Sequence, residues 1–381
     1  MTKQMKKVYV ALSGGVDSAV AALLLKEKGY DVRGVSMLEY DPHLGDIACT
    51  QDQDRRDAAA VAAALAIPFE EWDFRAVYKK AVVDYLVREY KLGRTPNPDV
   101  MCNKSVKFGL FLKKALQNDA DFIATGHYIC LRQKTRNSKL ETPKKSNAYK
   151  LQTTNYKLFQ AKDTNKDQSY FLYTLTQKQL KYCLFPLGSM TKPEVRKIAK
   201  KKGLPNWDKK DSQGVCFIGD ISMYDFLKKH LPMKSGPLVT PEGRIVGEHK
   251  GAAYYTIGQR HGLGFAGGSE PLYVVAKDMK KNTVVVAPEK ARNQLFQKEL
   301  VCKKIHWISG KAPFLPLNCK ARIRYRQPLQ SCILKKLEAR SYKLEAIFAK
   351  PQRAITPGQA VVFYKGKEML GGGTICSFER A

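Results

Sequence analysis

The chain has 381 residues, and its 66 Lys and Arg residues outnumber 35 Asp and Glu residues to give a formal net charge of +31 at pH 7. This length predicts two or three domains. No run reaches the ~18 apolar residues that a membrane span requires, and the N-terminus has no apolar signal segment, so we expect a cytoplasmic protein without a membrane partner. The charge favours nucleic acid as a partner over a merely solvated, lysine-rich surface.

Nine cysteines are spread from Cys49 to Cys376. An odd number without a secretion signal fits free thiols better than a disulfide framework. No two of them form a C-x-x-C pair, so neither a zinc ribbon nor an iron–sulfur cluster has a local signature, and we expect no metal site built from protein ligands alone.

The most informative stretch begins with an apolar run, Val8 to Leu12, which predicts a strand. The sequence SGGVDS follows at 13–18, and an Ala/Leu-rich helical run then ends at Gly29. Gly14 and Gly15 lack a Cβ, so backbone N–H groups can approach an anion at the helix N-terminus. This pattern indicates a phosphate loop, although a simple Gly-Gly turn is the competing interpretation. The loop lacks the G-K-[ST] ending of kinases and GTPases.

Strands and helices alternate along the next hundred residues. We predict strands at 31–40, 68–74 and 121–125, and helices at 52–66, 75–92 and 105–117. This alternation predicts right-handed βαβ units and an α/β fold with a doubly wound parallel sheet, whose ligands bind at the carboxyl ends of the strands. The phosphate loop, Met37, Cys102 and Gly126 would all lie at that edge.

The rest of the N-terminal part is less regular. The polar, basic segment 133–150 predicts a mobile surface hairpin or loop. A helical stretch is expected over 167–185, and the spacing of Thr191 and Glu194 predicts a capping box for a helix that stops at Gly203.

Beyond residue 222, short strands replace helices and predict a small central domain followed by a C-terminal β-barrel. We place the domains at 1–221, 222–290 and 291–381. The expected strands are 273–276 and 283–287 around a turn near Asn282, then 319–326, 331–337, 342–348, 360–364 and 373–378. Alternation in the strand 319–326 would put Arg322, Arg324 and Arg326 on one face, either as a ridge that tracks phosphates or as a solvated outer face.

Two cysteines have a setting that suits chemistry. Cys102 lies just before the predicted helix at 105, near Lys104 and Lys107, and both the helix N-terminus and the cations favour a thiolate. Cys216 lies in a glycine-containing loop. The competing interpretation is that both are simply buried apolar residues.

The motif SGGVDS resembles the PP-loop of the ATP pyrophosphatase superfamily, whose members split ATP into AMP and pyrophosphate while adenylating their substrate. Further motifs occur in order along nearly the whole chain: NPDVMCN at 97–103, TGHY at 125–128, NKDQSYFLYTL at 165–175, DSQGVCFIG at 211–219, GQRHGLG at 258–264, RYRQ at 324–327 and TPGQAVVFY at 356–364. Together they resemble the tRNA-specific 2-thiouridylase family. The resemblance implies an adenine nucleotide alpha hydrolase-like PP-loop domain, a small central domain and a C-terminal barrel.

This resemblance implies that the protein is an ATP-dependent tRNA-uridine 2-sulfurtransferase. ATP with Mg²⁺ would adenylate the C2 oxygen of the wobble uridine in Lys, Glu and Gln tRNAs, and sulfur from a Cys216 persulfide would replace that oxygen. Cys102 would act either as the thiol that forms a disulfide with Cys216 or as a base, and Asp99 would lie beside the target base. The nucleotide-binding positions implied are Ala11, Leu12, Ser13, Gly14, Gly15, Val16, Asp17, Ser18, Met37 and Gly126.

The same resemblance implies the partners. These are the anticodon region of tRNA and a sulfur donor, either a cysteine desulfurase or a sulfur-relay protein, and the enzyme itself is expected to be a monomer. The implied tRNA contacts are Asn97, Pro98, Asp99, His127, Lys166, Asp167, Gln168, Arg324, Tyr325 and Gln359. The alternatives are another PP-loop enzyme of the amidotransferase or ligase type, and a non-catalytic tRNA-binding protein.

Overall fold

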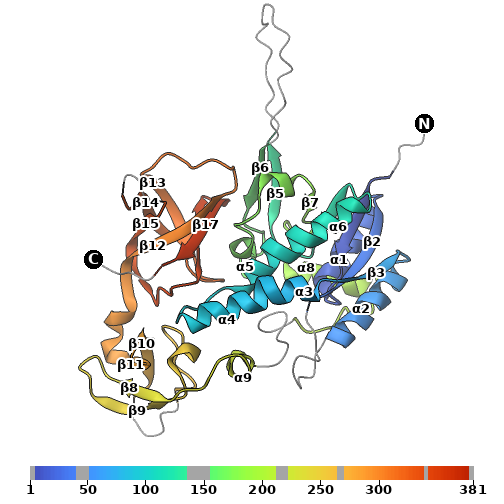
Figure 1. Cartoon of the computed structure of the whole chain (residues 1–381). Coiled ribbons are helices and arrows are strands. Elements are labelled where there is room, and N and C mark those ends of the chain that lie inside the picture. The colour runs from blue at the N-terminus through green and yellow to red at the C-terminus, as the bar shows by residue number, and fades with distance from the viewer. Residues whose placement is uncertain are drawn as a thin grey trace, which may run out of the picture.

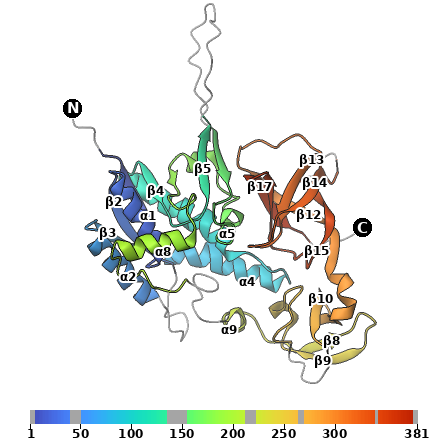
Figure 2. The ribbon, with the colours of Figure 1, turned by 180° about the vertical axis from the view of Figure 1, so that it is seen from behind.

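The computed structural model describes residues 5–39, 51–134, 155–211, 222–263, 270–338 and 342–376. Three bodies are visible in it: a parallel sheet with helices, a small four-stranded sheet, and a barrel (Figure 1). Seen from behind, the barrel and the small sheet still lie together on one side of the parallel sheet (Figure 2). Within these ranges, no helix has the length and apolar character needed to cross a membrane.

The parallel sheet confirms the doubly wound prediction. Each strand pairs in parallel with its neighbours. The order across the sheet is β3 (Phe69–Asp73), β2 (Asp31–Leu38), β1 (Lys7–Ala11), β4 (Phe122–Ala124) and β7 (Cys183–Leu184). The strand order reverses at β1, and doubly wound sheets bind ligands outside the carboxyl ends of the strands at such a switch point.

Helices cover both faces of this sheet. Two separate apolar cores form, one on each face. The first face carries α1 (Val16–Glu27), α2 (Gln51–Ala64) and α8 (Lys192–Lys201). On the second face lie one long helix made of α3 (Arg75–Tyr78), η2 (Lys79–Val83) and α4 (Asp84–Lys91), and another made of α5 (Pro98–Cys102), η3 (Asn103–Phe111) and α6 (Leu112–Gln117). The predicted capping box is confirmed, with Glu194 Oε2 accepting from Thr191 N at 2.6 Å.

Two helix predictions were wrong. The helix expected from 105 begins at Pro98, because the Asn97 side chain caps it by accepting from Val100 N at 3.2 Å. The stretch 167–185 is mostly irregular. It holds only η4 (Ser169–Phe171), α7 (Gln177–Leu180) and β7, and its side chains bond to distant segments: Tyr170 Oη donates to Ala360 O at 2.9 Å.

The central domain contains α9 (Met223–Lys228), η5 (Ala252–Tyr254) and four strands. In order across the sheet these are β10 (Leu272–Asp278), β11 (Thr283–Pro288), β8 (Gly236–Val239) and β9 (Ile245–His249). The first two strands confirm the prediction, including the turn at Asn282, whose φ is +48°. The other two were not predicted.

The C-terminal part is a β-barrel, as predicted, and it is closed by six antiparallel strands, of which the first, at 296–307, was not predicted. Closure follows because β12 pairs with both β15 and β17. After η6 (Glu289–Leu295), the strands are β12 (Phe296–Trp307), β13 (Leu317–Arg322), β14 (Gln330–Lys336), β15 (Leu344–Arg353), β16 (Ala360–Lys365) and β17 (Glu368–Ile375). The strand expected over 319–326 is β13, which begins two residues earlier and ends at Arg322.

A hairpin from the N-terminal half extends this barrel. Strands β5 (Cys130–Lys134) and β6 (Asn155–Phe159) pair with each other, and β6 also pairs with β17 through Phe159 and Glu368 (Figure 1). The segment 133–150, predicted to be a mobile surface hairpin or loop, lies outside the described part of the chain from residue 135 onward. The hairpin of β5 and β6 and the barrel therefore form one continuous sheet, which is separate from the parallel sheet.

Candidate active site

The loop between β1 and α1 is closed by its own serines. Ser18 Oγ donates to Gly15 O at 3.0 Å, and Ser13 N donates to Ser18 Oγ at 3.2 Å. Helix α1 begins directly after Gly15, which offers no capping side chain to the first-turn N–H groups. Those groups point out of the helix N-terminus, where an anion would be stabilised.

The glycines at the loop differ in how closely the surrounding atoms approach them. Gly14 has φ +71°, and a Cβ there would lie 2.2 Å from Asp54 O. A Cβ at Gly126, after β4, would lie 2.7 Å from Ser18 N, so that edge packs directly on the loop. At Gly15, by contrast, a Cβ would meet only Ser13 Oγ, at 3.5 Å. The loop therefore keeps an open side at Gly15, which fits a phosphate group.

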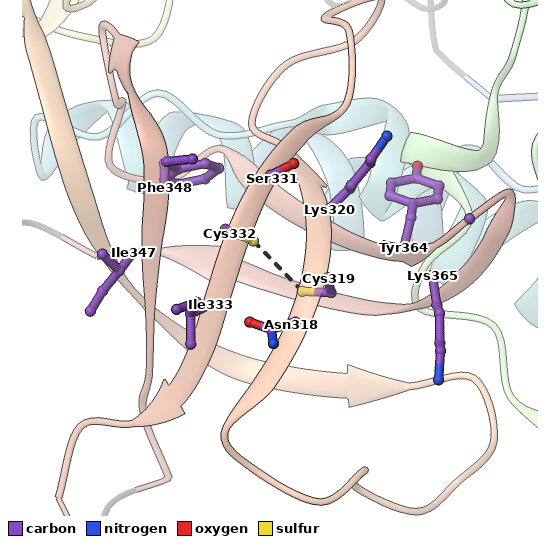
Figure 3. A pocket seen from close by; sticks show the side chains of 12 residues that line it. Asn318, Cys319, Lys320, Ser331, Cys332, Ile333, Ile347, Phe348, Tyr364 and Lys365 are labelled. Atoms are coloured by element: carbon purple, nitrogen blue, oxygen red, sulfur yellow. Dashed lines mark hydrogen bonds between the residues drawn. The ribbon is translucent and has the colours of Figure 1, made fainter.

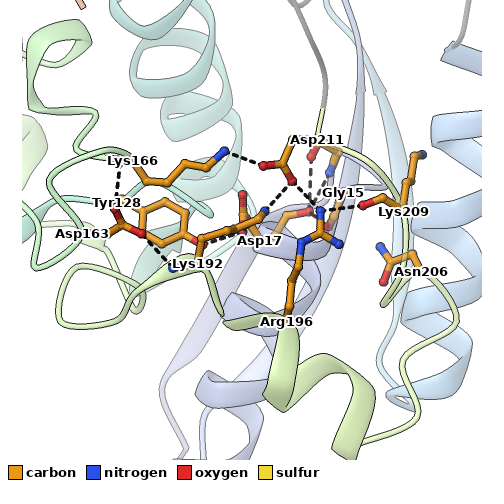
Figure 4. Close-up of polar contacts among 12 residues, drawn as sticks. Gly15, Asp17, Tyr128, Asp163, Lys166, Lys192, Arg196, Asn206, Lys209 and Asp211 are labelled. Carbon is orange, nitrogen blue, oxygen red and sulfur yellow. Dashed lines mark hydrogen bonds and ion pairs between the residues drawn. The ribbon is translucent and has the colours of Figure 1, made fainter. Parts of the chain in front are cut away.

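Beside the loop lies a cluster of ion pairs, which we call the loop-side cluster (Figure 4). Lys192 Nζ is 2.7 Å from an oxygen of Asp17 and 2.7 Å from an oxygen of Asp211. Tyr128 Oη donates to Asp17 at 2.7 Å. Burial alone would raise the pKa of Asp211, but hydrogen bonds from Lys166 and Lys192 outweigh it and hold that pKa at about 2. The members of the cluster are Asp17, Tyr128, Lys166, Lys192, Arg196 and Asp211.

The segment 206–211 is tied to the same loop. Asn206 Nδ2 donates to Gly14 O at 2.8 Å, and Lys209 pairs with Asp54 and Asp57 of α2. Cys216 lies outside the described residues.

Cys102 occupies a second, buried part of the site. It is the fifth residue of its helix rather than the residue before it, which corrects the prediction. Cys102 Sγ donates to Glu39 Oε1 at 3.8 Å, and Glu39 directly follows β2. Burial raises the pKa of Glu39 and of Asp99, and the charge of Lys107 partly opposes both shifts.

His127 connects the two parts. Its Nδ1 lies 2.8 Å from Thr125 Oγ1, and it follows Gly126, which packs on the loop. Burial, and then the charge of Lys107, lower the pKa of His127 to about 3, so the imidazole is neutral at physiological pH. The His127 ring also packs on Phe108, on the helix that continues from Cys102, with centroids 5.8 Å apart. Cys102 contacts Glu39 after β2, and the loop follows the neighbouring strand β1, so the thiol and the loop lie at the same carboxyl edge of the sheet.

The segment that presents Asn97, Pro98 and Asp99 is held by all three domains. Thr95 N donates to Pro357 O of the barrel at 2.9 Å, and Thr95 Oγ1 lies 3.1 Å from Thr256 Oγ1 of the central domain. Gln359 Nε2 donates to the carbonyls of residues 95 and 96, each at 3.1 Å. The position of these residues therefore depends on the assembled chain.

Several residues predicted to contact tRNA make contacts within the protein. Arg324 Nη2 donates to Ile257 O at 3.2 Å and to Ala354 O at 3.1 Å. The Tyr325 ring packs on Phe171 with centroids 4.7 Å apart, and Gln168 Oε1 accepts from Tyr128 N at 2.9 Å. Met37 packs at the edge of the core beneath the second sheet face.

The proposed arginine ridge is wrong. Arg322 is only 4% exposed and faces the protein interior, where it pairs with Asp167, and Arg326 lies in a turn with φ +62° beyond the end of β13. Alternation correctly separates two faces of a strand, but it does not say which face lies inside a barrel.

A separate hollow of about 550 Å³ lies in the barrel (Figure 3). Cys319 and Cys332 lie side by side in its lining, on the paired strands β13 and β14, with sulfur atoms 3.6 Å apart. Its lining contains no residue of the loop-side cluster.

Sequence reasoning missed Glu39, Lys192, Arg196 and Asn206. It named Lys107 only as a cation near Cys102, and Tyr128 only within the TGHY motif. Only the capping box beside Lys192 gave a local signal, and it indicated a helix start rather than a site. Within the described ranges, no three His, Cys, Asp or Glu side chains form a group that could hold a metal ion.

Comparison with known proteins covers almost the whole chain. A model described as a tRNA methyl transferase HUP domain matches residues 6–220, a tRNA methyl transferase PRC-barrel domain matches 224–288, and an aminomethyltransferase beta-barrel domain matches 297–375. A tRNA-specific 2-thiouridylase MnmA of Nitrosococcus oceani is 46% identical over 97% of this chain and 96% of its own length. One from Thiobacillus denitrificans is 47% identical over 97% of this chain and 99% of its own. Among solved structures, an NMN synthetase of Francisella tularensis is 16% identical, with a TM-score of 0.31 over 55% of this chain and 66% of that one. The loop at the switch point, the three matched models and the full-length identities agree, and the chain belongs to the tRNA-specific 2-thiouridylase family.

Proposed function

We propose that the protein is an ATP-dependent tRNA sulfurtransferase that converts the wobble uridine into 2-thiouridine and releases AMP and pyrophosphate. One observation carries this proposal: the phosphate loop follows β1, and Cys102 contacts Glu39 at the end of the neighbouring strand β2, so both lie at the same carboxyl edge of the sheet. Nucleotide activation and thiol chemistry can therefore act on the same base. The names of the relatives, which cover nearly the whole chain, support the same substrate.

ATP would bind with its phosphates at residues 13–18. The open side at Gly15 and the uncapped N-terminus of α1 fit this role, and residues 11–12, Met37 and Gly126 would complete the nucleotide site. Attack of the uracil oxygen on the α-phosphorus forms a bond to AMP while pyrophosphate leaves with the bonding electrons. Mg²⁺ would accompany ATP, and Asp17 is the nearest carboxylate on the loop.

Sulfur transfer would use two cysteines. A persulfide on Cys216 attacks C2 and displaces AMP, and the Cys102 thiolate then attacks the Cys216 sulfur. The products are the thiocarbonyl and a Cys102–Cys216 disulfide. A separate sulfur donor protein, a desulfurase or a relay protein, must reload Cys216.

The tRNA would bind across all three domains, whose boundaries we place at 221 and 290. Asn97, Pro98 and Asp99 would frame the flipped base, with His127 as a neutral partner. Asp167 would act indirectly, by fixing Lys166 and Gln168, because its own side chain is buried. Arg324, Tyr325 and Gln359 would contribute at the domain junctions. We take the enzyme to act as a cytoplasmic monomer.

The decisive experiment is nucleoside mass spectrometry of unmodified lysine tRNA after incubation with protein, ATP, Mg²⁺ and a persulfide-generating desulfurase. We expect 2-thiouridine with the wild type and none with Cys216→Ser. In a parallel incubation that also contains a methyl donor, a methylated nucleoside without 2-thiouridine would overturn the proposal in favour of the activity named by two of the family models. AMP formation with a small carboxylic acid and no tRNA would favour an amidotransferase or ligase, and tRNA binding without AMP would favour a non-catalytic protein.

A further inference from the structure

The phosphate loop contains no lysine, yet a lysine distant in sequence lies beside it. Lys192 is 175 positions from Asp17 along the chain, and its ammonium is 2.7 Å from an oxygen of that residue, in the first turn of α1. The Lys192 side chain is only 10% exposed. A buried cation thus lies next to the N–H groups that would meet a phosphate (Figure 4).

The position of Lys192 is fixed at both ends. It is the first residue of α8, and its backbone N donates to Asp163 Oδ2 at 2.9 Å. Its ammonium contacts Asp17 and Asp211, each at 2.7 Å. An ammonium has three N–H donors, so two are used by these carboxylates, and the third has no acceptor in the described part of the chain.

The neighbouring Arg196 differs from Lys192. Its guanidinium donates to Trp207 O at 3.2 Å, Lys209 O at 2.9 Å and Asp211 at 2.9 Å, and so anchors the segment 207–211. Arg196 therefore has a structural role that its contacts explain. The remaining donor of Lys192 is not explained in this way.

We propose that Lys192 binds the β- and γ-phosphates of ATP and stays with pyrophosphate as it leaves. This inference rests on the proposed ATP-dependent function. The loop supplies neutral N–H and hydroxyl donors, while Lys192 supplies the positive charge that a Walker-type lysine provides elsewhere. Negative charge grows on pyrophosphate as its bond to the α-phosphorus breaks, and the ammonium stabilises that charge. Asp17 and Asp211 position the ammonium.

The test compares Lys192→Met and Lys192→Arg with the wild type in the full chain, using calorimetric binding of pyrophosphate, ATP and AMP without tRNA. We expect Lys192→Met to weaken pyrophosphate and ATP binding roughly ten- to a hundred-fold, the effect of one charge-assisted hydrogen bond, while AMP binding stays unchanged. Lys192→Arg keeps the charge and should retain most of the affinity for pyrophosphate. The matched control is Lys162→Met, because Lys162 pairs with Glu194 of the same helix at 2.7 Å but is exposed.

Two outcomes overturn the assignment. Wild-type affinity for pyrophosphate in Lys192→Met would show that the lysine only ties α8 to α1, and equal losses for AMP and pyrophosphate would indicate a distorted loop. If Lys192→Met does not fold, Lys192→Arg decides: an AMP affinity that falls together with that for pyrophosphate contradicts the proposal. Failure of the wild type to bind ATP would overturn the proposed function itself, whereas thiouridine formation by the wild type tests that function independently of either variant.

Discussion

Arg322 and Asp167 form a fully buried ion pair between the barrel and the PP-loop domain. Their Nη2 and Oδ2 atoms are 3.1 Å apart, and the side chains are 4% and 0% exposed. Asp167 also accepts hydrogen bonds from Ala161 N at 3.1 Å and Ser169 Oγ at 3.0 Å. This carboxylate therefore organises the turn before η4 while it holds a barrel strand.

Replacing Arg322 with Met should lower the free energy of unfolding by about 3–5 kcal/mol, because it leaves the Asp167 carboxylate buried without its charged partner. Denaturant unfolding followed by circular dichroism measures this loss. The pair of Lys335 and Glu345 in the same barrel is the control because its lysine is 48% exposed, and Lys335→Met should cost less than about 1 kcal/mol. Equal effects of the two variants would contradict the prediction, whereas adding Asp167→Asn to Arg322→Met should restore part of the loss.

The two loop glycines should respond differently to alanine. Gly14→Ala should lower the melting temperature, since the backbone has φ +71° and the methyl would meet Asp54 O at 2.2 Å. Gly15→Ala should leave the melting temperature unchanged but weaken ATP binding, because its methyl would fill the open side of the loop. Thermal unfolding and calorimetry separate the two effects. An unstable Gly15→Ala protein, or one with full ATP affinity, would show that this side is not where phosphate binds.

Glu39→Gln should make Cys102 easier to alkylate. The Glu39 carboxyl accepts from Cys102 Sγ at 3.8 Å and, once ionised, places a negative charge beside the sulfur, so it favours the thiol over the thiolate. Because burial raises the pKa of Glu39, this charge forms only above the usual carboxyl range, and the difference between the proteins should grow as pH rises through that pKa. We expect the alkylation midpoint to fall by about one pH unit in the variant.

Peptide mass spectrometry after iodoacetamide treatment across a pH series gives this midpoint. The buried Cys183 in the same digest is the internal reference and should not change. A midpoint for Cys102 that stays constant or rises would show that Glu39 does not act on the thiol.

Cys319 and Cys332 should form a disulfide when the protein is treated with glutathione disulfide. They are directly opposite in register, and their sulfurs are 3.6 Å apart. The hydrogen bond from Cys332 lowers the pKa of Cys319, which makes Cys319 the attacking thiolate. It displaces one glutathione, and Cys332 then displaces the second. A cross-linked peptide pair that disappears in Cys319→Ser would confirm this, whereas a stable glutathione adduct on Cys319 would contradict it.

Much of the nucleotide domain could be predicted because its signals are local. The β1 strand, the SGGVDS loop and α1 are adjacent in sequence, and alternation of apolar runs indicated the parallel sheet. The helix start was misplaced at 105 because Pro98 and the capping Asn97 looked like loop residues, although this pair is a regular helix beginning.

The remaining features depend on contacts between distant segments. The Gln177 side chain, on the short helix α7, donates through Nε2 to Ile308 O at 2.6 Å, and no local pattern encodes that partner. Lys192 reaches the loop only because α8 packs against α1. The inward orientation of Arg322 could not be predicted without knowing that its partner, Asp167, is buried beneath it.

The pairing of β6 with β17 has a consequence for engineering this protein. A truncated chain that ended after the nucleotide domain would leave β6 with an open edge, a template for aggregation. Barrel exchange between relatives would have to preserve the pairing of Phe159 with Glu368, along with the Arg322–Asp167 contact. The barrel is therefore not an interchangeable module. Chimeras joined within the connecting segments should fold only when the barrel comes from the same parent as β6 and Asp167.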